Sequence, residues 1–333
     1  MRARRRPSPR AAGSARRRDG SPAARPAIAV VGSLNVDMVV RSPRLPEVGE
    51  TISGSEFAMF PGGKGANQAL AAARLGARVA MVGCVGGDTF GPRLREGLAS
   101  EGIDVAHVRV DPEAATGVAF ITVDAQGRNT IVVAPGANLR LSADDVLAAR
   151  RVVATASVLL VQLEVPLDAI HQAVRLAGAA GCRVILDPAP PQPLPADLYP
   201  LLSVINPNEV EARFLTGVAP DDDRSAAEAA DRLLARGAKA AVIKLGARGA
   251  YLATPQTRGR VGGIPVEAVD STAAGDAFAG ALAVALAEGK TLAEAVRFAN
   301  AAAALSVTRM GAQPAMPRRD EVEAFAAARD LAI

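Results

Sequence analysis

The chain has 333 residues, of which 50% are apolar and only 3% aromatic, with no tryptophan. It is long enough to bury a large core built mainly from alanine and aliphatic side chains, as one generous domain or two smaller ones. The net charge of +4 comes from the first 26 residues, which carry nine arginines and one aspartate; the remainder is mildly acidic, which gives no support to nucleic-acid binding by the folded body.

The Arg-rich segment at the start of the chain predicts a disordered tail over residues 1–27. It consists mainly of Arg, Pro, Ser and Ala without apolar periodicity, and blocks of like charge are usually solvated. A solvated extension is therefore favoured over a contact with nucleic acid or an anionic surface, or a transit sequence. The apolar run Ile28 to Val31 is too short for a signal peptide or a membrane span, so no membrane partner is predicted.

From Ile28 onward, short apolar runs alternate with helical patterns. Such alternation predicts a mainly parallel sheet covered by helices on both faces. Cys84 and Cys182 lie beside two of these runs, which suits buried free thiols and a reducing, cytoplasmic setting. The predicted strands are 28–31, 79–82, 158–161, 184–186, 204–205 and 241–245.

Two segments interrupt the alternation, at residues 38–59 and 117–133. Both are rich in β-branched residues and lack helical spacing, so they predict paired antiparallel strands. A small sheet of this kind could form a lid over the ligand edge, and its exposed face could serve a dimer contact.

The glycine-rich stretch Pro61 to Asn67 opens a predicted helix. It is not a P-loop, because Lys64 is followed by Gly65 where a P-loop needs Ser or Thr. No Gly-x-Gly-x-x-Gly follows the first strand either, so a dinucleotide site lacks its fingerprint. The stretch indicates backbone N–H groups and Asn67 placed close to a small polar ligand, with a plain turn as the alternative.

Polar residues follow the predicted strands at the point where each strand ends. In an open α/β sheet, ligands bind outside the carboxyl ends of the strands, so these residues are expected to gather at one edge. Asn208 and Glu211 are one helical turn apart and could hold Mg²⁺ through water, although the spacing alone favours a helix cap. His107, expected on a loop, and His171, expected on a helix, have no partners at the spacing of metal ligands or of a catalytic triad.

The stretch from Val269 to Phe278 places an Ala-Gly turn and a carboxylate at the start of an apolar helix. The backbone N–H groups of Ala274, Gly275 and Asp276 are expected to point outward and, with the helix dipole, to favour an anion such as a phosphate. Asp276 is then either a helix N-cap or a base beside that anion. Spacing alone does not separate the two.

Seven motifs give the chain a resemblance to the ribokinase branch of the PfkB carbohydrate kinase family, over everything except the basic tail. The resemblance implies a ribokinase-like three-layer α/β/α fold with a mainly parallel central sheet and a small β-sheet lid, and a kinase domain over residues 28–333. The motifs are Gly32–Asp37, Gly62–Gln68, Val85–Gly91, Gln162–Glu164, Asn206–Glu209, Asp270–Asp276 and Thr308–Pro314.

The resemblance also implies the members of four sites. Asp276 would be the base and would contact the sugar, with Ala274 and Gly275 as an anion hole. The other sugar-binding residues would be Asn35, Asp37, Gly63, Lys64, Asn67 and Glu164. The ATP site would contain Asn208, Lys244, Leu245, Gly246, Ala247, Arg248, Gly249, Gly275 and Asn300. A K⁺ site would comprise Asp270, Thr272, Ser306, Arg309, Gly311 and Ala315, and Mg²⁺ would involve Asn208 and Glu211, through water.

The activity implied is ATP-dependent phosphorylation of D-ribose at the 5-hydroxyl, with Mg²⁺ and K⁺ as cofactors and a homodimer formed through the lid. Another PfkB kinase acting on deoxyribose, fructose or a nucleoside such as adenosine is the nearest alternative. A non-catalytic sugar-binding regulator is an alternative from a different class. An intact Gly275-Asp276 turn favours the enzymes.

Overall fold

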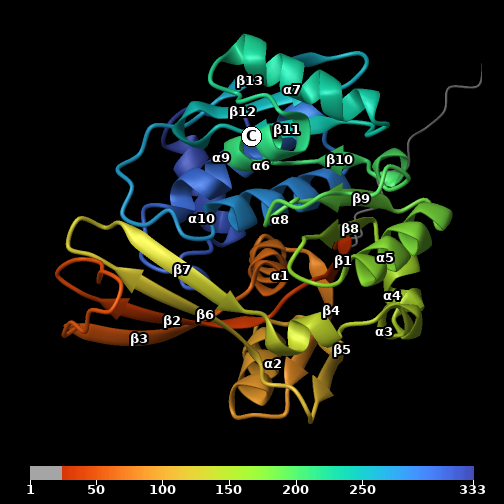
Figure 1. Ribbon diagram of the computed structural model, residues 1–333. Helices are drawn as coiled ribbons and strands as arrows, with labels where there is room; N and C mark the ends of the chain where they lie inside the picture. Colours follow the sequence, from red (N-terminus) through yellow and green to blue (C-terminus); the bar gives the residue numbers. More distant parts are fainter. Residues whose placement is uncertain (1–24) are drawn as a thin grey trace, which may run out of the picture.

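The computed structural model describes residues 25–333, and a nine-stranded sheet runs through the molecule (Figure 1). All neighbours are parallel except β12, which is antiparallel to both β11 and β13. The predicted mainly parallel sheet is confirmed. In spatial order its strands are β13 (Arg258–Gly262), β12 (Gly249–Ala253), β11 (Ala241–Lys244), β10 (Val204–Ile205), β9 (Arg183–Leu186), β8 (Val158–Val161), β1 (Ala27–Val31), β4 (Arg78–Gly86) and β5 (Asp104–Asp111).

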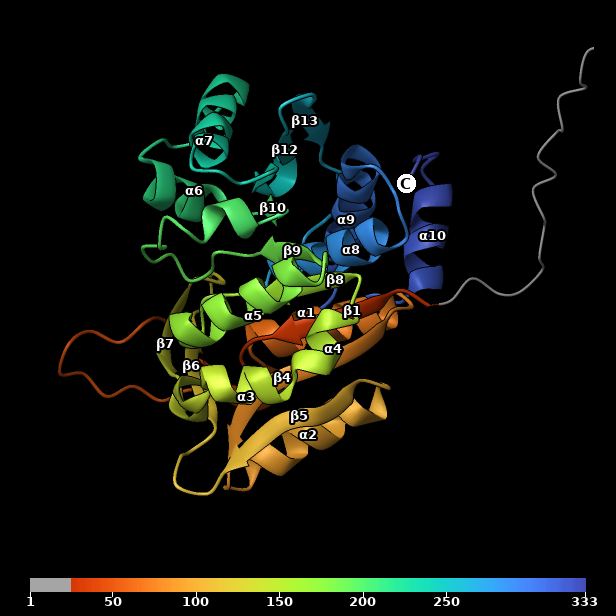
Figure 2. The same cartoon turned by 90° about the vertical axis from the view of Figure 1, so that its right-hand side faces the viewer.

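Successive residues of the central strands face two separate cores. Ile28 and Val30 of β1 pack into one core, whereas Ala29 and Val31 pack into the other, as the period of two in a strand requires. Helices cover both cores, which confirms the three layers (Figure 2). The first layer is α1 (Lys64–Arg74), α2 (Phe90–Ser100), α8 (Ala274–Ala287), α9 (Leu292–Ser306) and α10 (Arg319–Ala327); the second is α3 (Ala143–Ala148), α4 (Arg150–Ala154), α5 (Leu167–Ala179), α6 (Glu209–Thr216) and α7 (Asp223–Ala235).

A second sheet of four strands projects beside α1 (Figure 1). The predicted antiparallel pairing holds within each of its two hairpins, but the central pair, β2 with β6, is parallel. The strands also extend past the predicted limits at Met38, Met59 and Val133. They are β3 (Glu56–Gly62), β2 (Asn35–Arg41), β6 (Gly117–Val123) and β7 (Asn129–Ala134).

Three strands of the large sheet were not predicted. Strand β5 has only one buried residue, Val108, and His107 lies on it and not on a loop. Strands β12 and β13 contain several glycines and alanines, which are poor strand signals. These strands extend the sheet at both edges without changing its centre.

The ends of the predicted kinase domain can be compared with the structure only in part. Residues 1–24 of the predicted tail lie outside the described residues, and β1 begins at Ala27, inside the stretch predicted as tail. From Arg25 onward, none of the helices combines the length and apolar character needed to cross a membrane.

Candidate active site

Asp276 is the third residue of α8 and is almost completely buried, with 4% of its surface exposed. The N-cap position belongs to Ala273, and no side chain caps this helix. The Asp276 carboxylate instead accepts hydrogen bonds from Asn67 Nδ2 and Gln68 Nε2, each at 3.0 Å. The helix-cap interpretation of Asp276 is therefore wrong, because its carboxylate points toward α1 and not toward its own backbone.

The sequence predicted three free N–H groups at the start of α8, but the turn before the helix provides acceptors for two of them. Ala274 N donates to Ser271 O (3.2 Å) and Asp276 N donates to Ala273 O (3.0 Å). Of the three, the Gly275 N–H is the one without an acceptor within residues 25–333. Ala273 adopts a left-handed conformation (φ 58°, ψ 15°), which is rare for a residue with a side chain and turns the chain into the helix.

The start of α1 brings a second set of predicted residues to the same place. Gly63 has a φ of +88°, and an added Cβ would lie 2.7 Å from Asn35 N, so both its conformation and its surroundings require glycine. At Gly62, an added Cβ would lie 2.4 Å from both carboxylate oxygens of Asp37. The two glycines therefore let the backbone approach Asn35 and Asp37 closely.

Two predicted sugar-site residues, Asn35 and Glu164, are held by partners that sequence reasoning missed. Asn138 Nδ2 donates to Asn35 Oδ1 (2.7 Å), and Ser33 Oγ donates to Glu164 Oε2 (2.5 Å). The backbone N–H of Lys64 donates to the same Glu164 oxygen at 3.2 Å. Asn138 lies more than one hundred residues from Asn35 in the chain, so nothing local in the sequence links them.

The site combines several carboxylates with one buried lysine. Burial, together with Glu164 and Asp276, raises the pKa of Asp37 to about 6. Burial also raises the pKa of Asp276. Burial by itself would lower the pKa of Lys64, but the surrounding carboxylates, with Asp276 and Glu164 first, raise it, so the ammonium stays charged.

The end of β11 reaches the Asp276 turn through its last residue, Lys244. Lys244 Nζ forms a buried ion pair with Asp187 Oδ1 at 2.6 Å, and a Cβ added to Gly275 would lie 3.4 Å from the same nitrogen. Leu245 is buried and its N–H donates to Gly249 O, which closes the loop around η3 (Gly246–Arg248). A lysine charge thus lies beside Gly275.

Two other predicted ATP-site residues make contacts within the protein. Arg248 forms an ion pair with Glu209 at 2.5 Å. Asn300 Nδ2 donates to the carbonyl of Gly262 at 3.1 Å and so holds the end of β13.

Asn208 and Glu211 form a capping box at the start of α6. Asn208 Oδ1 accepts from Glu211 N (2.9 Å), and Asn208 N donates to Glu211 Oε2 (2.7 Å). The cap that the spacing favoured is confirmed. Each carboxylate oxygen of Glu211 keeps acceptor capacity for a water or an ion.

Asp270 connects two loops behind the Asp276 turn. Its Oδ1 accepts from the N–H and Oγ1 of Thr272, and its Oδ2 accepts from Gly311 N at 2.8 Å. Burial would raise its pKa, but these hydrogen bonds hold the pKa of Asp270 below its usual value, so it is a carboxylate. Ser306 O accepts from Arg309 N, whereas the Arg309 side chain pairs with Glu321 on α10, away from Asp270. Ala315 is buried.

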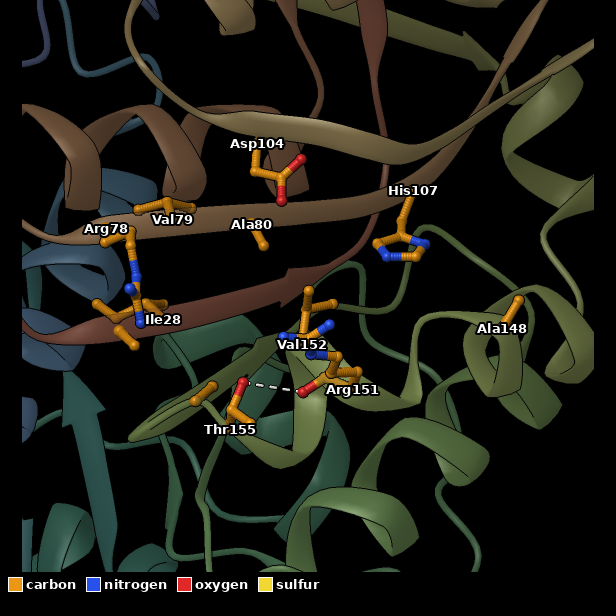
Figure 3. Close-up of a pocket in the computed structure, with 12 residues that line it drawn as sticks. Ile28, Arg78, Val79, Ala80, Asp104, His107, Ala148, Arg151, Val152 and Thr155 are labelled. Carbon is orange, nitrogen blue, oxygen red and sulfur yellow. Dashed lines mark hydrogen bonds between the residues drawn. The ribbon is translucent and has the colours of Figure 1, made fainter.

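A cavity of about 380 Å³ lies between the small sheet and the Asp270 loops. Asp37 and Phe60 line one side, and Asp270 and Thr272 line the other. A larger cavity of about 550 Å³, with Arg78, Asp104 and His107 around it, lies at the amino ends of β1, β4 and β5 (Figure 3). The polar residues that follow the strands gather at the opposite edge of the sheet. Because Asp37 lines the smaller cavity, that cavity adjoins the candidate active site.

Comparisons with a family pattern, with known sequences and with known structures all match carbohydrate kinases. The pattern of the pfkB family carbohydrate kinases matches residues 25–319. The chain is 43% identical over 301 residues to the ribokinase of Haemophilus influenzae, covering 90% of this chain and 98% of that protein. It is 34% identical to the deoxyribokinase of Salmonella typhi, covering 90% and 98%. The structure of Arabidopsis thaliana ribokinase with ribose and ATP superimposes with a TM-score of 0.84 at 36% identity, covering 90% of this chain and 98% of the other.

Proposed function

We propose that this chain, which belongs to the pfkB family of carbohydrate kinases, transfers the γ-phosphoryl group of ATP to the 5-hydroxyl of D-ribose and releases D-ribose 5-phosphate and ADP. It is an ATP-dependent sugar kinase. The observation that carries the assignment is the buried Asp276 carboxylate, held by two amides of α1 at the start of α8, beside Gly275 N–H and Lys244.

Asp276 would act as the base. As the 5-oxygen attacks the γ-phosphorus, the proton moves to the Asp276 carboxylate and the bond from the γ-phosphorus to the bridging oxygen breaks. A base in this position typically contributes about 10² to 10⁴ in rate. The Gly275 N–H and the dipole of α8 would stabilise the transferring group, and Lys244 would add a positive charge at the same point.

The sugar would lie at the start of α1. Asp37, Glu164 and Asn67 offer acceptors and donors for vicinal hydroxyls, together with Asn35, Gly63 and Lys64. The side-chain oxygen of Asn67 is buried and has no hydrogen-bond donor in the described chain, which suits a ligand hydroxyl. A sugar lacking one of these hydroxyls would leave a buried polar group unpaired.

Two cations fit the residues present. Asn208 and Glu211 would hold Mg²⁺ through water, because Mg²⁺ keeps several waters and takes only one or two carboxylates. Bound with ATP, Mg²⁺ would neutralise phosphate charge. The carboxylate of Asp270 and the carbonyls near Thr272, Ser306, Arg309, Gly311 and Ala315 offer oxygen ligands of the kind that replace the hydration shell of K⁺.

The outer face of the small sheet would form a homodimer. Its exposed apolar side chains include Phe57 (60%), Met59 (47%), Phe120 (53%) and Val132 (68%), which the strand register places side by side. A contiguous apolar patch of this kind on a soluble domain usually marks an interface.

A substrate panel tests the proposal. Purified protein with ATP, Mg²⁺ and K⁺ is given ribose, 2-deoxyribose, fructose or adenosine, and ADP release is measured. Ribose is expected to give the highest kcat/KM. A higher value for 2-deoxyribose would favour the deoxyribokinase alternative, which the Salmonella typhi relative makes the leading competitor. No turnover with any sugar would favour a non-catalytic binding protein.

A further inference from the structure

Gln68 joins two buried carboxylates through a single nitrogen. Its Nε2 donates one hydrogen bond to Asp276 Oδ1 (3.0 Å) and one to Asp187 Oδ2 (2.9 Å). Its Oε1 accepts from Gln162 Nε2 (2.6 Å), and the Gln68 side chain is fully buried. The amide therefore uses both of its hydrogens on carboxylates, and because each carboxylate accepts a hydrogen bond, the two carboxylates fix which end of the amide faces them.

This arrangement matters because the two carboxylate oxygens lie within about 6 Å of each other away from water. Two buried carboxylates at such a separation repel each other, which favours protonation of one of them and would leave that one neutral. A neutral Asp276 could not accept a proton from a hydroxyl. The neutral amide of Gln68 instead gives each carboxylate its own donor.

The other charges around Asp276 come from several elements. Lys64 of α1 lowers the pKa of Asp276 and Asp187 raises it. Asp37 of β2 is close enough for Asp276 to raise its pKa, and Lys244 of β11 pairs with Asp187 on the side away from Gln68. Among these charged groups lies the neutral side chain of Gln68, which contacts both the Asp276 and the Asp187 carboxylates.

We propose that Gln68 is a positioning residue that stabilises the Asp276 and Asp187 carboxylates side by side, and so keeps Asp276 ionised and directed toward the acceptor hydroxyl. This inference rests on the proposed role of Asp276 as the base. It assigns to Gln68 an effect on the pH dependence of turnover that a purely structural glutamine would not have.

The experiment compares Gln68→Met with Gln162→Met in the full-length protein. Methionine keeps the length of the side chain but donates no hydrogen bond. Gln162→Met is the matched control, because Gln162 touches Gln68 and neither carboxylate. For each protein, kcat and KM for sugar and for ATP are measured between pH 5 and 9 (the range flanking the neutral optimum of about 7 for a catalytic base), and thermal unfolding checks the fold.

Gln68→Met is expected to lower kcat about tenfold or more at neutral pH and to move the acid limb of the kcat profile up by about one pH unit, with KM for sugar little changed. Gln162→Met should keep the wild-type acid limb. An acid limb of Gln68→Met that superimposes on the wild-type curve would overturn the proposal.

Two further variants keep the outcomes distinct. If Gln68→Met does not fold, Gln68→Glu preserves the shape and carries the same test, since it replaces the double donor by a third carboxyl group. Asp276→Asn, measured on the same acceptor, tests the base separately. All variants are compared on the sugar that the wild-type protein phosphorylates best. If that sugar is not ribose, the proposed substrate is wrong, but the effect of Gln68 on the pH profile can still be measured.

Discussion

The carboxylate of Asp37 occupies the space that a side chain at Gly62 would need. A Cβ added at Gly62 would lie 2.4 Å from each Asp37 oxygen, closer than any stable contact. The acid on β2 and the glycine at the end of β3 are therefore mutually dependent.

Gly62→Ala should displace Asp37 and raise KM for the sugar about tenfold or more, with a smaller effect on KM for ATP. Steady-state kinetics with each substrate varied in turn checks this. Gly97→Ala on α2 is the control, because a Cβ there meets nothing within 4 Å and alanine favours a helix. Equal sugar KM values for Gly62→Ala and the wild type would contradict the expected displacement.

Asp276→Asn keeps the shape of the side chain and removes the base. We expect kcat to fall by at least about 10², while sugar binding measured by calorimetry changes little. The asparagine can still accept one hydrogen bond from α1, so the fold should persist. Near-normal turnover in this variant would remove Asp276 from the role of base.

Asp37 links pH to stability as well as to binding. Its pKa is about 6 in the folded chain, against 3.8 for an unperturbed carboxyl, so the folded state binds the extra proton and loses stability as pH rises through this range. Asp37→Asn should therefore be more stable than the wild type at pH 7.5, by on the order of 1 kcal/mol, and this gain should vanish near pH 4.

Denaturant unfolding at the two pH values measures this difference. The same variant should bind sugar more weakly at pH 7.5, because it loses an ionised acceptor. A stability difference that is equal at pH 4 and pH 7.5 would show that titration of Asp37 is not its source.

We expect the kinase activity to respond to monovalent cations, because Asp270 joins the two loops of the proposed K⁺ site. Activity should be higher in KCl than in NaCl at equal ionic strength, and Asp270→Ala should abolish the difference. Asp320→Ala, at the exposed start of α10, is the control and should retain the wild-type ratio. An unchanged ratio in Asp270→Ala would place any cation effect elsewhere.

A charge on the outer face of the small sheet should prevent dimer formation. Phe120→Asp is expected to shift the protein toward monomer in sedimentation experiments, because burying a carboxylate in an apolar interface is costly. Phe214→Asp on α6 is matched in side chain and in exposure, at 51% against 53% for Phe120, and should leave the assembly unchanged. A monomeric wild type would contradict the proposed interface.

Sequence patterns predicted the centre of the fold better than its edges. The strands β1, β4, β8 and β9 contain continuous apolar runs because both faces are covered, and such runs are easily recognised. Strand β5 lies at one edge with exposed positions, and β12 is buried but contains glycine, alanine and no β-branched residue, so neither gives this signal.

The candidate site was predictable as a set of strand-end residues but not as a network. Ser33 and Asn138 are unremarkable in the sequence, and their roles arise from partners 131 and 103 residues away. Likewise, spacing could not show whether Asp276 caps its helix. That depends on the left-handed backbone of Ala273, which makes Asp276 the third residue of α8 and not the residue before it.

The backbone of Ala273 also limits how the turn can change. A left-handed alanine costs about 1 to 2 kcal/mol relative to a right-handed one, and glycine would remove that cost. Glycine would also increase the conformational entropy of the unfolded chain, which costs about 0.4 to 1 kcal/mol of stability. The strain is the larger effect, so glycine at position 273 would raise net stability by up to about 1 kcal/mol. What alanine adds is a smaller set of accessible backbone conformations in the segment that leads into Gly275 and Asp276.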